Sequence, residues 1–360
     1  MTDPFGRRFL PGPCEVHPDV LQAMARSQSG EDGARAHSDL QPRLRELFRT
    51  SQDVMLIASS ASGMMEAAIR SGVEERVLVV IGGEYGERFA QVAQACGKDV
   101  VRAMVPAGRT LEAEHLAQFL DGPEVDAVAL VHSEPSSGSL APLSELARVI
   151  RSRKDVHILV DAAGSIGGCP VETDQWELDF VFTGSQKALA LPPGLALGVA
   201  SPRLLARAGK LSGRGRYFDL VLLAQDACRP SFTQSPQQAA LAAQLDRIAA
   251  EGGIEARWKR HHEMLTLVEG WVLLRPEFSM LPPEGRRSWT VSCIRLPPGL
   301  SSAGLVDEMK GLGWVVAQGQ GDLRDSTMRI GHMGDVSPAH LSQLLAALAQ
   351  VVAARSAANV

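Results

Sequence analysis

The sequence lacks any arrangement of cysteines that could build a disulfide framework or hold a metal. Its five cysteines are odd in number and scattered, with no C-x-x-C pair: Cys14, Cys96, Cys169, Cys228 and Cys293. Small disulfide-stapled folds and structural zinc sites require close, regular spacings. We therefore expect reduced thiols, no metal site and a cytoplasmic location.

An excess of basic charge and long apolar runs are also lacking. The 36 basic residues are interspersed among 41 acidic ones, and the formal net charge is -5. No basic stripe could neutralise a phosphate backbone, so nucleic acid is not an expected partner. No segment approaches the roughly 18 apolar residues of a membrane span, and the N-terminus has no apolar run after its basic pair. We expect a soluble protein with no membrane partner.

Short apolar runs occupy the region from about residue 54 to 200. They read VMLIA, RVLVVIG, DVVRAMV, VDAVALVHS, VHILVDA and DFVFTG, and amphipathic stretches such as ERFAQVAQACG and LSELARVIRSR separate them. This alternation is typical of strands that crossover helices bury on both faces. The pattern predicts an α/β protein with a mostly parallel sheet.

Different patterns flank this region. Residues 14–50 carry two helical patterns joined by the polar linker SQSGEDGARAH, and we expect them to pack on the core or on a partner. After about residue 255, a helix, WTVSCIRLP, SAGLVDEMKGLG, WVVAQG, TMRIGHMG and a final helix predict a small α+β domain. A chain of 360 residues is long enough for two domains. We predict an N-terminal segment over 1–50, a large domain over 51–255 and a small domain over 256–360.

An aspartate and a lysine follow two of the predicted strands. VHILVDAAGSIGG places Asp161 at the end of one strand, and DFVFTGSQKAL places Lys187 just past another. Open α/β sheets bind ligands at this edge. A pyridoxal cofactor needs this pair, a carboxylate to keep its ring nitrogen protonated and an amine to bond to its aldehyde. A lone lysine is more often an ordinary loop residue, so the prediction depends on further motifs.

The segment LIASSASGMMEAAIRSG supplies a candidate anion site. Ser60, Ala61 and Ser62 would present backbone N–H groups and two hydroxyls at a helix N-terminus, which suits a phosphate. Serine is also a favoured N-cap residue in helices that bind nothing. From these residues alone, a phosphate site and a plain helix cap both remain open.

Together these motifs resemble the class V branch of fold-type I aminotransferases, especially the alanine–glyoxylate and serine–glyoxylate (serine–pyruvate) group. The matching pieces cover nearly the whole chain in the family's order: LPGPCEVHP, SSASGMMEAA, GGEYGERF, HSEPSSGSLAPL, VDAAGSIGG, TGSQKAL, PPGLALGV and MRIGHMGD. The resemblance implies a mostly parallel, seven-stranded sheet in the large domain and a smaller C-terminal α+β domain. It also implies pyridoxal 5′-phosphate as the cofactor and a homodimer with shared active sites.

The resemblance further implies roles for individual residues. Lys187 and Asp161 would be the catalytic pair, and Tyr85 would stack on the cofactor ring. Arg329 would pair with the substrate α-carboxylate, a task that suits a planar guanidinium. The implied cofactor-binding residues are Ser60, Ala61, Ser62, Tyr85, Asp161, Ala163, Gln186, Lys187 and Thr233, and the implied substrate-binding residues are Arg329 and Ser136. Thr233 would reach the phosphate of the neighbouring subunit, a role that Gln234 could take instead.

Three departures from the family pattern concern the phosphate and the substrate. Ala61 replaces the usual glycine between two hydroxyl residues, Pro135 replaces a hydroxyl or small polar residue, and the sequence around Thr233 is not the commonest form. Pro135 removes a possible hydrogen bond near the substrate. The resemblance therefore leaves the amino-acid preference open.

The resemblance implies transfer of an amino group from a small L-amino acid, of the alanine or serine type, to a 2-oxo acid such as glyoxylate or pyruvate. The alternatives are a 2-aminoethylphosphonate transaminase, a lyase, a cysteine desulfurase, or a binding module without catalysis. A desulfurase needs a mobile catalytic cysteine, for which Cys228 is the candidate. Retention of Asp161, Lys187 and Arg329 argues against a non-catalytic module.

Overall fold

A seven-stranded sheet forms the centre of the protein, whose structure is a computed structural model describing residues 5–25, 31–227 and 236–358. Its strands in spatial order are β1 (Met55–Ile57), β9 (Ala196–Ala200), β8 (Phe180–Gly184), β7 (His157–Asp161), β4 (Ala127–Val131), β2 (Arg76–Ile81) and β3 (Asp99–Met104). Six of these seven strands run in one direction, and β9 runs antiparallel to them. The prediction of an α/β protein with a mostly parallel sheet is confirmed, and each of the six apolar runs contains a strand.

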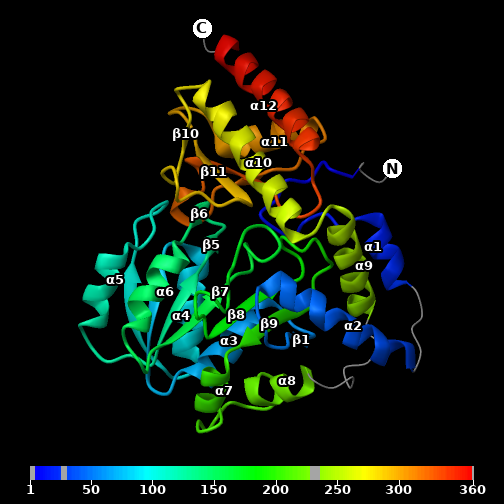
Figure 1. Cartoon of the computed structure of the whole chain (residues 1–360). Helices are drawn as coiled ribbons and strands as arrows, with labels where there is room; N and C mark the ends of the chain where they lie inside the picture. The colour runs from blue at the N-terminus through cyan, green and yellow to red at the C-terminus, as the bar shows by residue number, and fades with distance from the viewer. Residues whose placement is uncertain (1–4, 26–30, 228–235, 359–360) are drawn as a thin grey trace.

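Helices cover both faces of this sheet (Figure 1). One face packs against α2 (Glu31–Phe48), α5 (Ala113–Leu120), α6 (Leu143–Arg151) and α9 (Pro236–Ala250), and the other against α3 (Ala61–Gly72), α4 (Glu84–Ala95), α7 (Pro202–Ala208) and α8 (Leu220–Ala227). Successive strand residues point to opposite faces. Val128 and Leu130 accordingly belong to one core, and Ala127 and Ala129 to the other.

A smaller antiparallel sheet lies above the large one (Figure 1). Its order is β10 (Ser279–Met280), β11 (Val291–Arg295), β13 (Thr327–Gly331) and β12 (Ala317–Gln318), and it packs against α10 (Ile254–Leu273), α11 (Ser302–Gly311) and α12 (Pro338–Ala358). A short 3₁₀ turn, η1 (Gly321–Leu323), precedes β13, and the hairpin of β5 (Ser133–Glu134) and β6 (Ser139–Leu140) follows β4. The boundaries at residues 50 and 255 stay a prediction. Within the described ranges, no helix is long and apolar enough to span a bilayer.

The helices before the large sheet differ from the prediction at one point. The first helix, α1, covers Pro18–Met24, as the helical pattern indicated, but α2 begins at Glu31, inside the predicted linker. The polar composition of residues 27–37 suggested a loop. Glutamate, alanine and arginine are good helix formers whatever their polarity, and Ala34, Arg35 and Ala36 therefore extend the helix towards its N-terminus.

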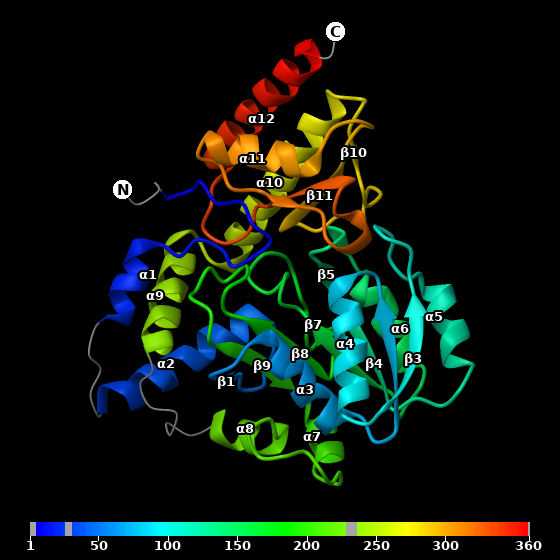
Figure 2. The same ribbon diagram turned by 180° about the vertical axis from the view of Figure 1, so that it is seen from behind.

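The segment before α1 runs between the two sheets (Figure 2). Phe9 N–H donates to Val315 O at 2.7 Å, and Gly331 N–H donates to Phe9 O at 2.8 Å, so the segment is bonded to the smaller sheet and its flanking loop. Further along, Cys14 N–H donates to Gln186 O at 2.9 Å. The N-terminal segment therefore joins the smaller sheet to the loop after β8.

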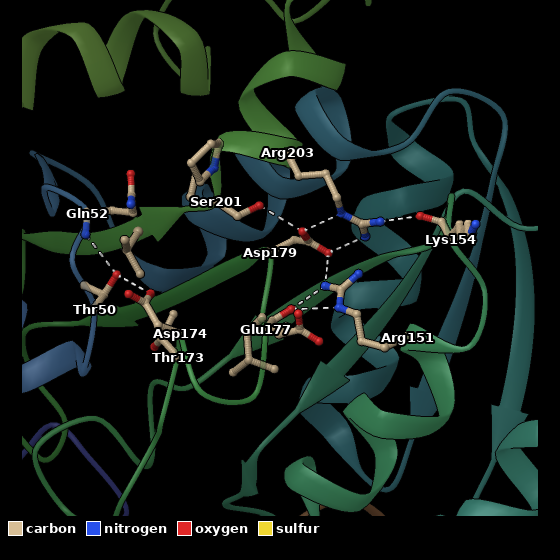
Figure 3. Close-up of a pocket in the computed structure, with 14 residues that line it drawn as sticks. Thr50, Gln52, Arg151, Lys154, Thr173, Asp174, Glu177, Asp179, Ser201 and Arg203 are labelled. Atoms are coloured by element: carbon tan, nitrogen blue, oxygen red, sulfur yellow. Dashed lines mark hydrogen bonds and ion pairs between the residues drawn. The ribbon is translucent and has the colours of Figure 1, made fainter.

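A cavity of about 570 Å³ lies where β8 begins, at the opposite edge of the large sheet from Asp161 (Figure 3). The buried carboxylate of Asp179 accepts hydrogen bonds there from Arg151 Nη2 at 2.5 Å and Arg203 Nη2 at 2.9 Å. It also accepts from Ile158 N–H and from Ser201 Oγ, both at 2.8 Å. Burial alone would raise the pKa of Asp179, but its hydrogen-bond donors outweigh burial and lower the pKa well below its usual range. These charges hold the ends of β7, β8 and α7 together.

We expect Asp179→Asn to destabilise the protein by about 3 kcal/mol, because it leaves two partly buried guanidinium groups without their anion. The pKa of Asp179 is lower in the folded than in the unfolded state. The stabilisation that ionised Asp179 gives to the fold is therefore present above about pH 4 and lost as the pH falls further. The variant should lack this pH-dependent contribution to the free energy of unfolding. Urea unfolding at neutral and acidic pH measures both effects.

Asp174→Asn is the matched control for this prediction. Asp174 lines the same cavity and accepts from Thr50 and Ser51, but it is exposed, so its loss should cost less than about 1 kcal/mol. Equal stability of wild type and Asp179→Asn at neutral pH would contradict the structural role of Asp179.

Candidate active site

Parallel pairing of β7 with β8 brings Asp161 and Lys187 to the same edge of the large sheet. Asp161 is the last residue of β7 and pairs with Phe182 of β8, and Lys187 follows β8 by three residues. Both side chains are buried. The prediction that they lie at the mouths of adjacent strands is confirmed by these positions.

The Lys187 ammonium has an unusual environment for a buried cation. Its Nζ donates to Pro11 O at 2.8 Å and lies 5.4 Å from the centroid of the Tyr85 ring. No carboxylate of a described residue forms an ion pair with it. Gly12, with φ +94°, permits this packing, since a Cβ there would lie 2.5 Å from Lys187 Cδ. A buried amine held by one carbonyl is available for chemistry.

The carboxylate of Asp161 is also incompletely paired. Its Oδ1 accepts from Ala163 N–H at 2.8 Å. Burial raises the pKa of Asp161 to about 6, and the nearby Glu134 charge adds to this, against the opposing effects of the Ala163 N–H and Lys187. A cation placed opposite Asp161 would stabilise its ionised form.

The start of α3 forms a cradle beside these residues. Ser60 is the N-cap but makes no side-chain capping hydrogen bond, and Ala61 and Ser62 begin the helix. Gly184 lies against this turn, since a Cβ there would be 3.5 Å from Ala61 N. The same Cβ would be 3.0 Å from Gln186 Oε1, a buried atom without a hydrogen-bond partner. The uncapped N–H donors at the start of α3 favour an anion site over a plain helix cap, and Gln186 would meet an anion through its Nε2 amide rather than through this oxygen.

Tyr85 lies at the start of α4, and Glu134 holds this turn in place. Tyr85 N–H and Gly86 N–H donate to Glu134 Oε2 at 3.2 and 3.3 Å. The buried carboxylate of Glu134 therefore caps α4 from the hairpin after β4. Burial raises the pKa of Glu134 despite these donors. The sequence motifs assigned Glu134 no role, although an acidic residue just after a buried strand in HSEPSSG was a signal.

Ser136, a predicted substrate ligand, has its hydroxyl engaged in the same cap. Its Oγ donates to Glu134 Oε1 at 2.5 Å and accepts from Glu84 N–H at 3.1 Å. Contact with a substrate stays a prediction for Ser136. Thr233, Gln234 and Cys228 lie outside the described residues, so their predicted roles stay predictions as well.

Arg329 comes to this region from the smaller sheet. It lies in the middle of β13 and its Nε donates to Gln318 O at 2.8 Å. Its Nη1 donates to Gln320 Oε1 at 2.8 Å and to Pro135 O at 3.1 Å. Burial lowers its pKa, yet a guanidinium remains charged at any working pH. Among the described residues no carboxylate pairs with Arg329, and a partly buried cation of this kind suits a carboxylate ligand.

These residues fit the pyridoxal phosphate that the motifs imply. Lys187 offers a buried amine without an anionic partner among the described residues, and Asp161 offers a carboxylate whose ionised form needs a cation. The uncapped N–H groups at the start of α3 lie next to Gly184 and would donate to a phosphate, as would the Gln186 Nε2 amide once its side chain turns. The donors and acceptors match the aldehyde, ring nitrogen and phosphate of the cofactor.

Comparison with protein families agrees with this geometry. The family model described as aminotransferase class-V matches residues 46–301, which is more than half of the chain. This match includes the strand ends, Asp161 and Lys187, but not Arg329.

Individual proteins match almost end to end. An uncharacterised aminotransferase of Methanocaldococcus jannaschii is 33% identical, with 91% of this chain and 87% of that protein covered. A 2-aminoethylphosphonate–pyruvate transaminase of Aeromonas hydrophila is 30% identical, with 95% and 93% covered. The solved alanine–glyoxylate aminotransferase of Nostoc sp. superposes with a TM-score of 0.91 at 27% identity, with 98% and 96% covered.

We expect Asp161→Asn to stabilise the cofactor-free protein at neutral pH by up to about 2–3 kcal/mol. Each unit by which the folded state raises the pKa of Asp161 costs about 1.4 kcal/mol once the carboxylate is ionised, and the variant avoids this cost. Asparagine can still accept from Ala163 N–H but carries no buried charge. The folded-state pKa of Asp161 is raised, so the contribution of Asp161 to wild-type stability is most favourable below about pH 4 and falls as the pH rises to about 6. Urea unfolding of cofactor-free protein at about pH 5 and about pH 8 measures the slope, and identical slopes for both proteins would contradict the prediction.

Proposed function

The chain belongs to the class V aminotransferases, and from this premise we propose that it moves the amino group of a small L-amino acid, of the alanine or serine type, to a 2-oxo acid such as glyoxylate or pyruvate. Members of this family depend on pyridoxal 5′-phosphate, so the chain is a pyridoxal-phosphate-dependent transaminase. The proposal concerns its substrates and the role of each residue.

The observation that carries the proposal is the environment of Arg329. Its guanidinium is held by neutral oxygens of Gln318, Gln320 and Pro135, so its charge is left for a ligand. The α-carboxylate of an amino acid or a 2-oxo acid satisfies this charge with two parallel hydrogen bonds. Both substrates of a transaminase carry such a group, which explains how one site serves both.

The remaining residues fit the steps of amino transfer. Bound pyridoxal phosphate supplies an aldehyde that takes up the amino group and a ring that withdraws electrons from the substrate Cα. Lys187 Nζ is the base that removes the proton from this Cα. Asp161 keeps a proton on the ring nitrogen, and the Tyr85 ring fixes the plane of the cofactor. Ser60, Ala61, Ser62 and Gln186 bind its phosphate, and Ala163 N–H orients Asp161.

Among the class V alternatives, the structure disfavours a desulfurase for the cysteines it describes. Burial raises the pKa of all four described thiols, to about 12 for Cys14, to about 11 for Cys293, and above the usual value for Cys96 and Cys169. A catalytic cysteine needs a thiolate at working pH, which these residues do not provide. The likeness to a 2-aminoethylphosphonate–pyruvate transaminase keeps an aminophosphonate as the second candidate donor.

We expect L-alanine or L-serine, added without an acceptor, to convert the absorbance band of the bound cofactor to that of its amino form. Lys187→Ala should slow this conversion by at least about 1000-fold, because the base is missing. Arg329→Gln should raise the amino-acid concentration needed by about 10- to 100-fold, since a charge-assisted pair is lost. Stopped-flow absorbance measures each change.

Three outcomes separate the candidates. A shift with 2-aminoethylphosphonate but with no α-amino acid would replace the proposed donor by the aminophosphonate. A band that no donor moves would leave the cofactor in place and contradict transamination. Normal turnover by Lys187→Ala would contradict the role of the lysine.

We also propose that the protein acts in the cytoplasm as a homodimer whose partner supplies Thr233 or Gln234 to the phosphate. Family resemblance at Thr233 supports this assembly, and so does the exposure of Ser60, since the described residues leave this side of the phosphate cradle uncovered. Scattered cysteines without disulfides among the described residues support the location.

We expect subunits with complementary defects to restore activity when mixed. Lys187→Ala removes the base of its own site, and Thr233→Ala with Gln234→Ala weakens the phosphate site of its partner. After refolding together, one site of a mixed dimer would have all its residues, and activity should reach about a quarter of wild type for random pairing. Activity no higher than the sum of the separate variants would contradict a shared site.

A further inference from the structure

A buried arginine of α10 connects the two loops on which the active site depends. Arg257 is 1% exposed, and its Nη2 donates to Ala188 O at 3.0 Å. The same Nη2 lies 2.8 Å from Asp335 Oδ1. Ala188 directly follows Lys187, and Asp335 lies in the loop just after the strand of Arg329. The N-terminal end of α10 lies between the large and the smaller sheet (Figure 1). There the Arg257 guanidinium contacts both loops.

Two more side chains of α10, those of Arg260 and His261, bind the loop that follows β13. Arg260 Nη2 donates to Gly334 O at 2.9 Å, and its Nη1 donates to Val336 O. His261 Nε2 accepts from Gly334 N–H at 3.2 Å. Three side chains of one helix therefore fix the loop that leaves β13.

The two loops are also in direct contact. Gly334 has φ +85°, and a Cβ there would lie 3.0 Å from Ala190 Cβ and 3.3 Å from Cys14 Cβ. Ala190 itself has φ +52°, and its N–H donates to Lys187 O at 2.8 Å. The turn that carries Lys187 is therefore wedged between Gly334 and Arg257, and a shift of one loop must displace the other.

Asp335 stays ionised beside Arg257 although the side chains of both residues are buried. Burial alone would raise the pKa of Asp335, but Arg257 and the hydrogen bond from Gln244 outweigh it and lower the pKa. Arg257 Nη1 also lies 3.3 Å from Glu251 Oε2. A buried ion pair contributes little net stability compared with apolar packing, yet it demands one geometry. Two directed bonds from a planar guanidinium fix position better than apolar contacts would.

We propose that the Arg257–Asp335 pair is a positioning device that holds Lys187 and Arg329 in a fixed relation to each other. The inference rests on the proposed function, in which Lys187 works on the Cα and Arg329 binds the carboxylate bonded to that Cα. Two groups that act on adjacent carbon atoms of one substrate tolerate little relative movement, and about 1 Å of misplacement can cost about 100-fold in rate. Arg257 itself touches neither group and acts through the loops.

The test compares Arg257→Gln with Arg257→Lys and with Arg151→Gln. Arg151 is the matched control, because it also pairs with a buried aspartate and donates to a backbone carbonyl, but at the opposite edge of the sheet. Fluorescence titration of cofactor-free protein gives the dissociation constant of pyridoxal phosphate. Absorbance against pH reports the environment of Lys187, and stopped-flow gives the rate and half-saturation of the alanine reaction.

We expect Arg257→Gln to weaken cofactor binding by at least about 10-fold, to shift the absorbance–pH profile and to slow the alanine reaction by about 100-fold. Arg257→Lys should recover part of each loss, since it keeps the charge but not the fork. Arg151→Gln should lower the unfolding midpoint while it leaves all three readouts within about 2-fold of wild type.

Equal cofactor affinity, pH profile and rate in Arg257→Gln and Arg151→Gln would overturn the inference. If Arg257→Gln does not fold, Asp335→Asn removes the same pair from the other side and is judged by the same criteria. A wild-type protein that binds the cofactor but does not respond to amino acids would refute the proposed function alone, because the comparison of cofactor affinity would still decide the role of Arg257.

Discussion

The parallel pairing of β7 with β8 is the constraint on which the proposed active site depends. The register that pairs Asp161 with Phe182 sends both strands out of the same edge of the sheet, so Asp161 and the loop of Lys187 must meet there. A slip by one residue would turn every side chain of a strand to the other face, where both cores are already filled. At the other end of β8, the ion pairs of Asp179 fix the same strand. The position of the lysine is therefore set from both ends.

The site gathers charges that the described part of the chain does not neutralise. Lys187 has a carbonyl partner, Arg329 has three neutral oxygens and Asp161 has one backbone N–H, and all three are partly or fully buried. Such an arrangement weakens a protein that binds nothing, which is typical of functional sites. Elsewhere the buried charges are paired, as with Asp179 and Arg257. This contrast distinguishes residues that stabilise the fold from the residues that we propose bind a ligand.

Local patterns in the sequence predicted the parts of the fold that depend on local physics. Apolar runs located six strands of the large sheet, and the rule that ligands bind at strand ends was enough to pair Asp161 with Lys187. The roles proposed for Tyr85 and Arg329 needed the family resemblance, because nothing in their spacing links them to the lysine. Glu134 and Arg257 were missed because their importance comes from contacts between distant segments. The periodicity of a sequence reports only on local structure and does not predict such contacts. The start of α2 was missed because polarity was given more weight than helix propensity.

The N-terminal segment has a consequence for how the protein is made. Residues around Phe9 are synthesised long before Val315 and Gly331, to which they bond. Until β13 has left the ribosome, Pro11 has no smaller sheet to hold it beside Lys187, and the lysine lacks its carbonyl partner. Contacts between such distant residues form late and slow folding. Lys187 therefore reaches its final environment only after β13 has been translated, so completion of the proposed cofactor site is coupled to folding of the smaller sheet.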